Sequence, residues 1–397
     1  MLPVAESAAA QNRRYELADI FRNYGEQYRQ NHSLPLSHLR VMRAVERCRT
    51  AALGGHLQRC DACGFERPAY NSCRNRHCPK CQSLAKARWL EKQKLELLPV
   101  GYFHLVFTVP HELNRLILVN KKPLIDILFH AVSETLLEFA RTHLGGTLGL
   151  TAVLHTWDQI LLDHFHLHCL VPAGALSFDQ NRWIPARKNF LFHVKALSVV
   201  FRGKFLQFLK NAFDQKKLLF PGQSAPLADA VAFKLLLKTV GQKSWVVYAK
   251  KPFASPDSVL DYLGRYTHRV ALSNNRIRSV HNSEVTFTYR DRKKQNQLKL
   301  MKLQADEFIR RFLLHVIPKG LMRVRHFGFL ANNSKERLSK CRQLLGLLPA
   351  LPKPLQRSTH ELMLALTGID LTRCPLCRNG TLVLLARLPA PTPQDSS

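Results

Sequence analysis

The sequence predicts an α+β fold with an antiparallel sheet flanked by helices, preceded by a small helical, zinc-ribbon-like domain. Three observations lead there. Helical and strand-like segments follow one another irregularly along the 397 residues, without the repeated strand–helix alternation of a doubly wound sheet. Several strand-like segments are neighbours in the chain, and a cysteine-dense, turn-rich stretch precedes them. The length leaves room for two or three domains.

Each expected element follows from local periodicity and its stop signals. Apolar residues three and four positions apart predict helices over 13–30, 37–48, 83–98, 121–141, much of 190–240, 255–270 and 305–316. Ser255 and Pro256 suit the cap and first position of one of them. Strand composition covers 102–110, 149–157, 165–176, 243–253 and a basic pair over 284–303.

These elements divide the chain into three expected parts. Residues 1–95 form a helical and zinc-binding domain that binds DNA, and residues 96–345 form the catalytic domain. Residues 346–397 hold a proline-rich linker and a tail with one CxxC pair.

The charge favours a polyanionic partner. The chain has 59 Lys and Arg against 28 Asp and Glu, a net charge of +31. Each phosphate that such a surface neutralises releases counterions, so DNA is the expected partner. An anionic membrane is the rival partner, but no concentrated amphipathic basic helix or lipidation signal supports it.

We also expect a cytoplasmic protein, because the first residues lack a signal-peptide core and no stretch reaches 18 apolar residues. In that reducing compartment clustered cysteines indicate metal rather than disulfides.

The cysteine spacing predicts structural zinc. Two CxxC pairs, Cys60–Cys63 and Cys78–Cys81, lie 14 residues apart, a spacing that can bring four thiolates around one tetrahedral ion. Further soft ligands in the same stretch would suffice for a second ion, and spacing leaves the partition open: Cys48, His56, Cys73 and His77. Cys374 and Cys377 supply only half of the ligands that a zinc site needs. They either take part in an additional zinc site or are two free thiols. Cys169 and Cys341 are isolated and expected to be buried.

Histidines at alternate positions predict a second kind of metal site. His164, His166 and His168 share one face of a strand, since side chains alternate with period two. Two imidazoles can hold a divalent ion, and Gln159 can add an oxygen ligand. Three protein ligands leave positions open for substrate oxygens, which is typical of a catalytic site.

A pair of tyrosines downstream could supply the nucleophile. Tyr262 and Tyr266 are four residues apart on the expected helix, so both hydroxyls emerge on one face. The alternative is that both tyrosines belong to an aromatic stripe in the core. A metal that polarises a phosphodiester and a tyrosine hydroxyl directed at its phosphorus would, however, together suffice for nucleophilic attack. Strand joining would then need no nucleotide cofactor. Residues 240–245 lack the glycine spacing of a phosphate-binding loop.

The chain resembles the two-tyrosine transposases of rolling-circle bacterial insertion sequences, the insertion sequence ninety-one family, whose nuclease motif is His-hydrophobic-His. The similarity covers about residues 12–345. It rests on long motifs: "CRTAALGGHLQRCDACGFERPAYNSCRNRHCPKCQ", "LHTWDQILLDHFHLHCLVPAGAL", "YLGRYTHRVALSNNRI" and "FIRRFLLHVIPKGLMRVRHFGFLAN".

The resemblance implies a zinc-binding N-terminal domain followed by a nuclease domain of the His-hydrophobic-His type. It implies His166 and His168 as the metal-binding pair, Gln159 as third ligand, with His268 as rival, and Tyr262 and Tyr266 as the catalytic tyrosines. His164 then falls to a supporting or surface role. Mg²⁺ or Mn²⁺ would be the catalytic ion, and the tyrosine would form a 5′-phosphotyrosine bond to single-stranded DNA.

Basic residues near these motifs are candidate DNA contacts. They are Arg74, Arg76 and Lys80 in the cysteine loop, and Arg265, Arg269, Lys319 and Arg325 near the tyrosines or in the last motif. The last four are candidates for stabilising the charge on the phosphate during the reaction, and each could equally be a contact that positions the DNA backbone.

Two other functions stay open at this point. One is a plasmid replication initiator or relaxase with the same chemistry; the other is a zinc-dependent DNA-binding protein whose nuclease site has decayed. A carboxylate-triad transposase is disfavoured, because the chain has only 28 acidic residues and no compelling triad.

Overall fold

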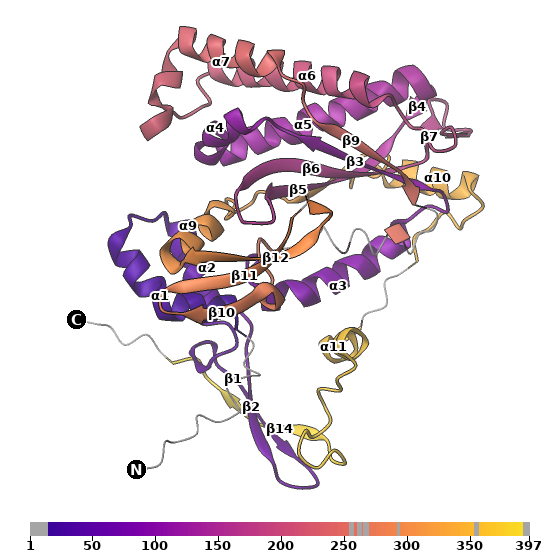
Figure 1. Cartoon of the computed structure of the whole chain (residues 1–397). Coiled ribbons are helices and arrows are strands. Elements are labelled where there is room, and N and C mark those ends of the chain that lie inside the picture. Colours follow the sequence, from indigo (N-terminus) through magenta and orange to yellow (C-terminus); the bar gives the residue numbers. More distant parts are fainter. Residues whose placement is uncertain are drawn as a thin grey trace.

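The computed structural model describes residues 15–253, 258–259, 264, 270–291, 294–352 and 357–391. Within these ranges the chain forms helices and antiparallel sheets, which confirms the α+β class (Figure 1). None of the described helices is long and apolar enough to cross a membrane.

A five-stranded antiparallel sheet is the centre of the molecule. Its order is β13-β5-β6-β3-β9, so β6 lies in the middle. The strands are β3 (Tyr102–Thr108), β5 (Gly149–Trp157), β6 (Asp163–Pro172), β9 (Val247–Phe253) and β13 (Val324–Gly328). Gly328 has φ +62°, and a Cβ there would lie 1.6 Å from the carbonyl oxygen of Leu148, so only glycine fits beside β5.

A layer of helices covers one face of this sheet (Figure 1). It consists of α4 (Asn114–Val119), α5 (Lys121–Phe139), α6 (Val194–Asp214) and α7 (Ala230–Gln242), with a π-helical turn over Ala140–Leu144. Alternate strand residues, among them Phe107, Phe165 and Leu167, pack with Phe201 of α6 in the largest apolar core. The other strand residues, including the histidines, therefore face away from this layer.

A second core lies on the other side of the sheet. The expected basic strand pair is β11 (Glu284–Asp291) with β12 (Gln297–Gln304), joined by β10 (Ile277–His281). This small sheet packs with α1 (Leu17–Asn31), α2 (Leu36–Glu46) and α9 (Ala305–Leu314). The first two helices thus share a core with residues from 271 to 316, so the predicted boundary at residue 95 separates segments that pack together.

The cysteine-rich segment forms a hairpin of β1 (Gly55–Cys60) and β2 (Glu66–Tyr70), followed by α3 (Pro79–Glu96). The chain ends with α10 (Lys335–Leu344), α11 (Thr359–Thr367) and β14 (Leu382–Leu388). Strand β14 pairs with β1, giving the order β14-β1-β2 (Figure 1). The expected tail therefore becomes part of the N-terminal hairpin's sheet.

The expected strand over 165–176 is divided between two sheets. Strand β6 ends at Pro172, which has no N–H to donate to a ladder. The chain continues as β7 (Gly174–Ser177) between β4 (Gly146–Thr147) and β8 (Trp183–Pro185). Short 3-10 helices cover Ala51–Leu53, His111–Leu113, Gly222–Ala228 and Asn274–Arg276.

Candidate metal centres and catalytic face

Four buried histidines of the central sheet gather on the face away from the helical layer. We call this the histidine face; it carries His104 on β3, His155 on β5, and His166 and His168 on β6. His166 is the register partner of His155, while His104 lies one strand over, beside Leu170. All four side chains are nearly or fully buried.

Three of these imidazoles are close enough to share one ion. Ring nitrogens of His155, His166 and His168 all lie within 4.8 Å of one another. The Nε2 atoms of His166 and His168 are 3.1 Å apart. The expected histidine pair therefore has converging nitrogens, and His155 joins it.

Backbone and side-chain contacts orient the pair. Nδ1 of His166 donates to the carbonyl oxygen of His164 at 2.8 Å. In a neutral His166 ring the proton is therefore on Nδ1, and Nε2 has a lone pair that can accept a hydrogen bond or bind a metal. Nδ1 of His168 lies 2.9 Å from Nε2 of His104. Burial, with Lys250 nearby, lowers the pKa of His104 to about 4, so that ring is neutral. The tautomer of His168 decides which ring donates in its contacts with His104 and His166, and Nε2 of His166 can accept a hydrogen bond from His168 or coordinate a cation.

His155 is the residue that sequence reasoning missed. It stacks on Trp157 with ring centroids 5.2 Å apart and meets His168 edge-on at 4.5 Å. The sequence does contain a signal for it. The expected strands 149–157 and 165–176 are neighbours in the chain, and their pairing would place a residue of the first strand opposite His166. The register itself depends on where the connecting turn begins, which the sequence leaves open.

The sequence offered two candidates for the third ligand, Gln159 and His268. Gln159 lies in the turn beyond Trp157, the last paired residue of β5, and its backbone carbonyl accepts a bond from Arg276. His268 falls outside the described residues. His164 is half-buried, and its carbonyl holds His166, which agrees in kind with the supporting role expected of it.

The predicted tyrosines, Tyr262 and Tyr266, also lie outside the described residues, as do Arg265 and Arg269. Two described residues of the same stretch show what it packs against, the central sheet for Val259 and α3 for Gly264. Val259 is fully buried against Tyr102 and Leu170, which flank His104 and His168 in β3 and β6. A Cβ on Gly264 would lie 3.0 Å from side-chain atoms of Lys86 and Leu90 in α3.

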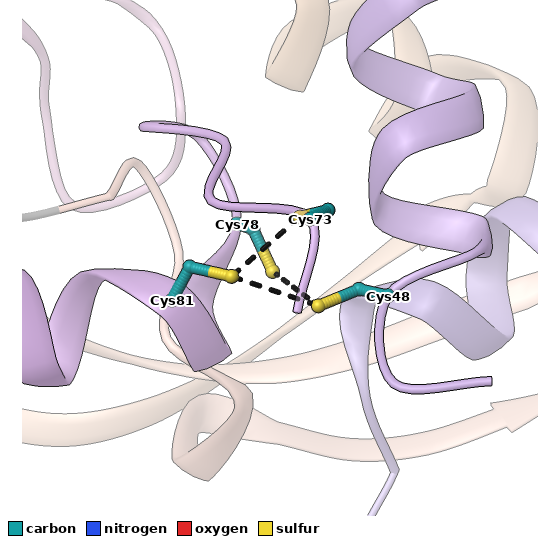
Figure 2. Close-up of side chains that lie close together, drawn as sticks. All are labelled: Cys48, Cys73, Cys78 and Cys81. Atoms are coloured by element: carbon teal, nitrogen blue, oxygen red, sulfur yellow. Dashed lines mark hydrogen bonds between the residues drawn. The ribbon is translucent and has the colours of Figure 1, made fainter. Parts of the chain in front are cut away.

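Four cysteines of the N-terminal half converge (Figure 2). We call them the N-terminal cysteine cluster: Cys48, Cys73, Cys78 and Cys81. Their closest Sγ–Sγ distances are 3.5 and 3.6 Å. A tetrahedral zinc with bonds of about 2.3 Å would separate its sulfurs by about 3.8 Å, close to these values. Hydrogen bonds from the other three thiols lower the pKa of Cys81, at the start of α3, and the thiolate is the form of cysteine that binds zinc.

The two CxxC pairs, whose spacing allowed one shared ion, belong to different groups of cysteines. Cys60 and Cys63 lie at the turn of the β1–β2 hairpin and join Cys374 and Cys377 in a second group, the split cysteine cluster. The hairpin carries its turn away from Cys78 and Cys81, which start α3. His56 is exposed on β1 and His77 is buried, and neither belongs to a cysteine group. Cys169 and Cys341 are buried, as expected.

The candidate DNA contacts divide by exposure. Arg74 and Lys319 are exposed. Arg76 instead donates to the carbonyl oxygens of Leu321 at 2.6 Å and Pro318 at 2.8 Å, so it ties the cysteine loop to the segment before β13. Lys80 pairs with Glu16, and Arg325 pairs with Asp126 and lies 4.1 Å from the ring centre of Phe129. These last three have roles within the fold.

Comparisons with known proteins identify both halves. Residues 149–337 match the family described as "Putative transposase", and residues 20–109 match a transposase zinc-binding domain. A putative transposase from Sinorhizobium fredii is 48% identical to this chain over 379 residues, and the match covers 93% of this chain and 94% of the relative. The transposase for insertion sequence element IS801 from Pseudomonas savastanoi pv. phaseolicola is 30% identical over 337 residues, covering 83% and 79%. No solved structure matches the chain significantly.

Proposed function

The chain belongs to the insertion sequence ninety-one family of transposases, and from this premise we propose that it nicks and joins single-stranded DNA at the ends of its element through a 5′-phosphotyrosine intermediate. The transposition would follow a rolling-circle route, with the free 3′ end of the nicked strand available to prime synthesis. DNA is the partner of the reaction.

One observation carries this proposal: three buried histidines converge on the face of the sheet away from its helical layer. Their converging ring nitrogens suit a divalent ion, and the His164 carbonyl and the His104 ring orient two of them. We propose His166, His168 and His155 as ligands, with Gln159 or His268 as further candidates. A bound Mg²⁺ or Mn²⁺ would polarise the scissile phosphate there.

The reaction we propose uses the tyrosine pair as nucleophiles. The hydroxyl oxygen of Tyr262 or Tyr266 attacks phosphorus and loses its proton, the bond from phosphorus to the 3′ oxygen breaks, and that oxygen takes up one proton, so no net proton is gained or lost. The DNA 5′ phosphate remains esterified to the tyrosine. The reverse attack by a 3′-hydroxyl restores a phosphodiester, so the bond energy is retained. A second tyrosine allows a second strand to be cleaved before the first is resolved.

The N-terminal cysteine cluster supports this site structurally. A zinc held by Cys48, Cys73, Cys78 and Cys81 would fix the end of α2 to the start of α3. The loop between them exposes Arg74 for phosphate contact, while Arg76 holds the loop on the catalytic half. Of the basic candidates we keep Arg74, Lys319 and the pair Arg265 and Arg269 as DNA contacts.

The test uses a single-stranded oligonucleotide that carries one end of the element. With Mg²⁺ or Mn²⁺, a label at its 3′ end should become attached to the protein in an SDS-resistant adduct, whereas a 5′ label should leave on a shortened free strand. Transfer of the 5′ label would reverse the proposed polarity. No adduct with either metal would reject the enzymatic proposal and favour a DNA-binding protein.

Variants assign the roles. Replacing both Tyr262 and Tyr266 with Phe should abolish the adduct, while Tyr289→Phe on β11 serves as the matched control. His168→Ala should abolish the adduct without loss of DNA binding at equal salt. Joining of the two element ends by the wild type would separate a transposase from a replication initiator or relaxase of the same chemistry.

A further inference from the structure

The split cysteine cluster joins the two ends of the chain. Cys60 and Cys63 come from the β1–β2 hairpin, and Cys374 and Cys377 precede β14, more than 300 residues later. We propose that these four thiolates hold a second structural zinc, independent of the N-terminal cysteine cluster and of the catalytic site. The two matched families end at residues 109 and 337, so half of this site lies beyond both.

The sulfur positions suit a tetrahedral ion better than disulfides. Sγ of Cys60 lies 3.7 Å from that of Cys377, and Sγ of Cys63 lies 3.7 Å from that of Cys374. All four sulfurs lie within 4.8 Å of one another. A tetrahedral zinc would separate its sulfurs by about 3.8 Å, whereas a disulfide bond is about 2.05 Å long.

The two CxxC pairs form equivalent turns. In each, the residue after the second cysteine donates its N–H to the carbonyl oxygen of the first: Gly64 to Cys60 and Arg378 to Cys374, both at 3.1 Å. Both donors have positive φ, +73° and +59°. In the C-terminal turn, the N–H of Gly380 points at Sγ of Cys377 at 3.4 Å, as expected for a backbone amide that stabilises a metal-bound thiolate.

The two turns also approach too closely for a side chain between them. A Cβ on Gly380 would lie 2.4 Å from Sγ of Cys60, so glycine is required there. Beside it, the Asp61 carboxylate accepts from the N–H of Thr381 at 2.8 Å, and the N–H of Asp61 donates back to the Thr381 carbonyl at 3.1 Å. These bonds continue directly into the β14–β1 ladder.

The apolar packing here is too small to hold the strands by itself. The core beside the sulfurs contains three buried residues, Cys60, Cys374 and Leu382, with Phe65 and Cys377 packed against them. Most of β14 is exposed. Small units with so little core are usually stabilised by metal or disulfides, so the ion is expected to be the main link between the two ends.

The proposal is tested by counting metal in the purified full chain. Wild-type protein should hold two zinc ions per chain, and a Cys374→Ser, Cys377→Ser double variant should hold one. Cys169→Ala, a buried cysteine outside both clusters, should keep two. One ion in both the wild type and the double variant, with zinc in excess, would overturn the proposal, as would finding these four cysteines as disulfides in the protein purified without oxidant.

Cobalt replacement keeps the test decisive if zinc is lost during purification. Thiolate-to-Co²⁺ charge-transfer absorption per chain should fall by half in the double variant. Gly380→Ala should cause the same loss, because its Cβ would displace Cys60, whereas Asn379→Ala at the exposed neighbouring position should not. Unchanged absorption in the double variant, with circular dichroism equal to that of the wild type, would also refute the second site.

Discussion

His315 is expected to make the fold around the histidine face sensitive to acid. Its Nε2 donates to the carbonyl oxygen of Leu161 at 3.1 Å, and its Nδ1 lies 3.3 Å from Oγ1 of Thr156. Both partners belong to the β5–β6 hairpin that carries the candidate metal histidines. The ring is 1% exposed. Burial lowers the pKa of His315 from 6.5 to about 3, so the folded protein keeps it neutral.

The sign and size follow from that pKa. Below pH 6.5 His315 is protonated in the unfolded chain but stays neutral in the folded chain. The free energy of unfolding therefore falls as the pH falls towards 3. The change is about 1.4 kcal/mol per pH unit, or about 2 kcal/mol of unfolding free energy between pH 7.5 and pH 5.

Urea denaturation at the two pH values measures this contribution. Other buried histidines and the cysteines also titrate, so the comparison is between wild type and His315→Gln. The variant should lose about 2 kcal/mol less between pH 7.5 and pH 5 than the wild type does. His111→Gln, at an exposed position, should behave as the wild type. Equal losses in wild type and His315→Gln would refute the view that His315 is buried and neutral.

Three further predictions concern the metal site, the sheet edge and the DNA surface. His155→Ala should weaken Mn²⁺ binding at least tenfold by calorimetry, because it removes one of three converging imidazoles; an unchanged affinity would exclude His155 as a ligand. Gly328→Ala should leave little folded protein, seen as loss of soluble monomer, since its Cβ would overlap the Leu148 carbonyl; normal folding would contradict the β13–β5 pairing. Arg74→Ala should reduce the slope of log DNA affinity against log salt concentration by about the value of one phosphate contact, because Arg74 is exposed. Arg76→Ala should instead lower the midpoint of thermal unfolding, because it removes two hydrogen bonds to backbone carbonyls.

Local patterns predicted the elements well. The strand expected over 149–157 is β5 to the residue, and the alternation of histidines correctly predicted that His166 and His168 share a face. Periodicity suffices for such features because it depends only on neighbours in the chain.

Features that depend on pairing across the chain were beyond local patterns. His155 reaches the histidine pair only through the β5–β6 register, and Cys374 reaches Cys63 only because β14 pairs with β1. The spacing of the first two CxxC pairs favoured a shared ion, but the hairpin separates them. Likewise Arg76 looks like a DNA contact in the sequence, yet its guanidinium is satisfied by backbone carbonyls.

We propose above that a tyrosine of the stretch after β9 becomes covalently attached to DNA. Mass spectrometry of tryptic peptides from the adduct, after nuclease trimming, tests it directly. The account predicts a nucleotide linked through its 5′ phosphate to Tyr262 or Tyr266. Attachment to any other residue, or a 3′-phosphate linkage, would contradict it.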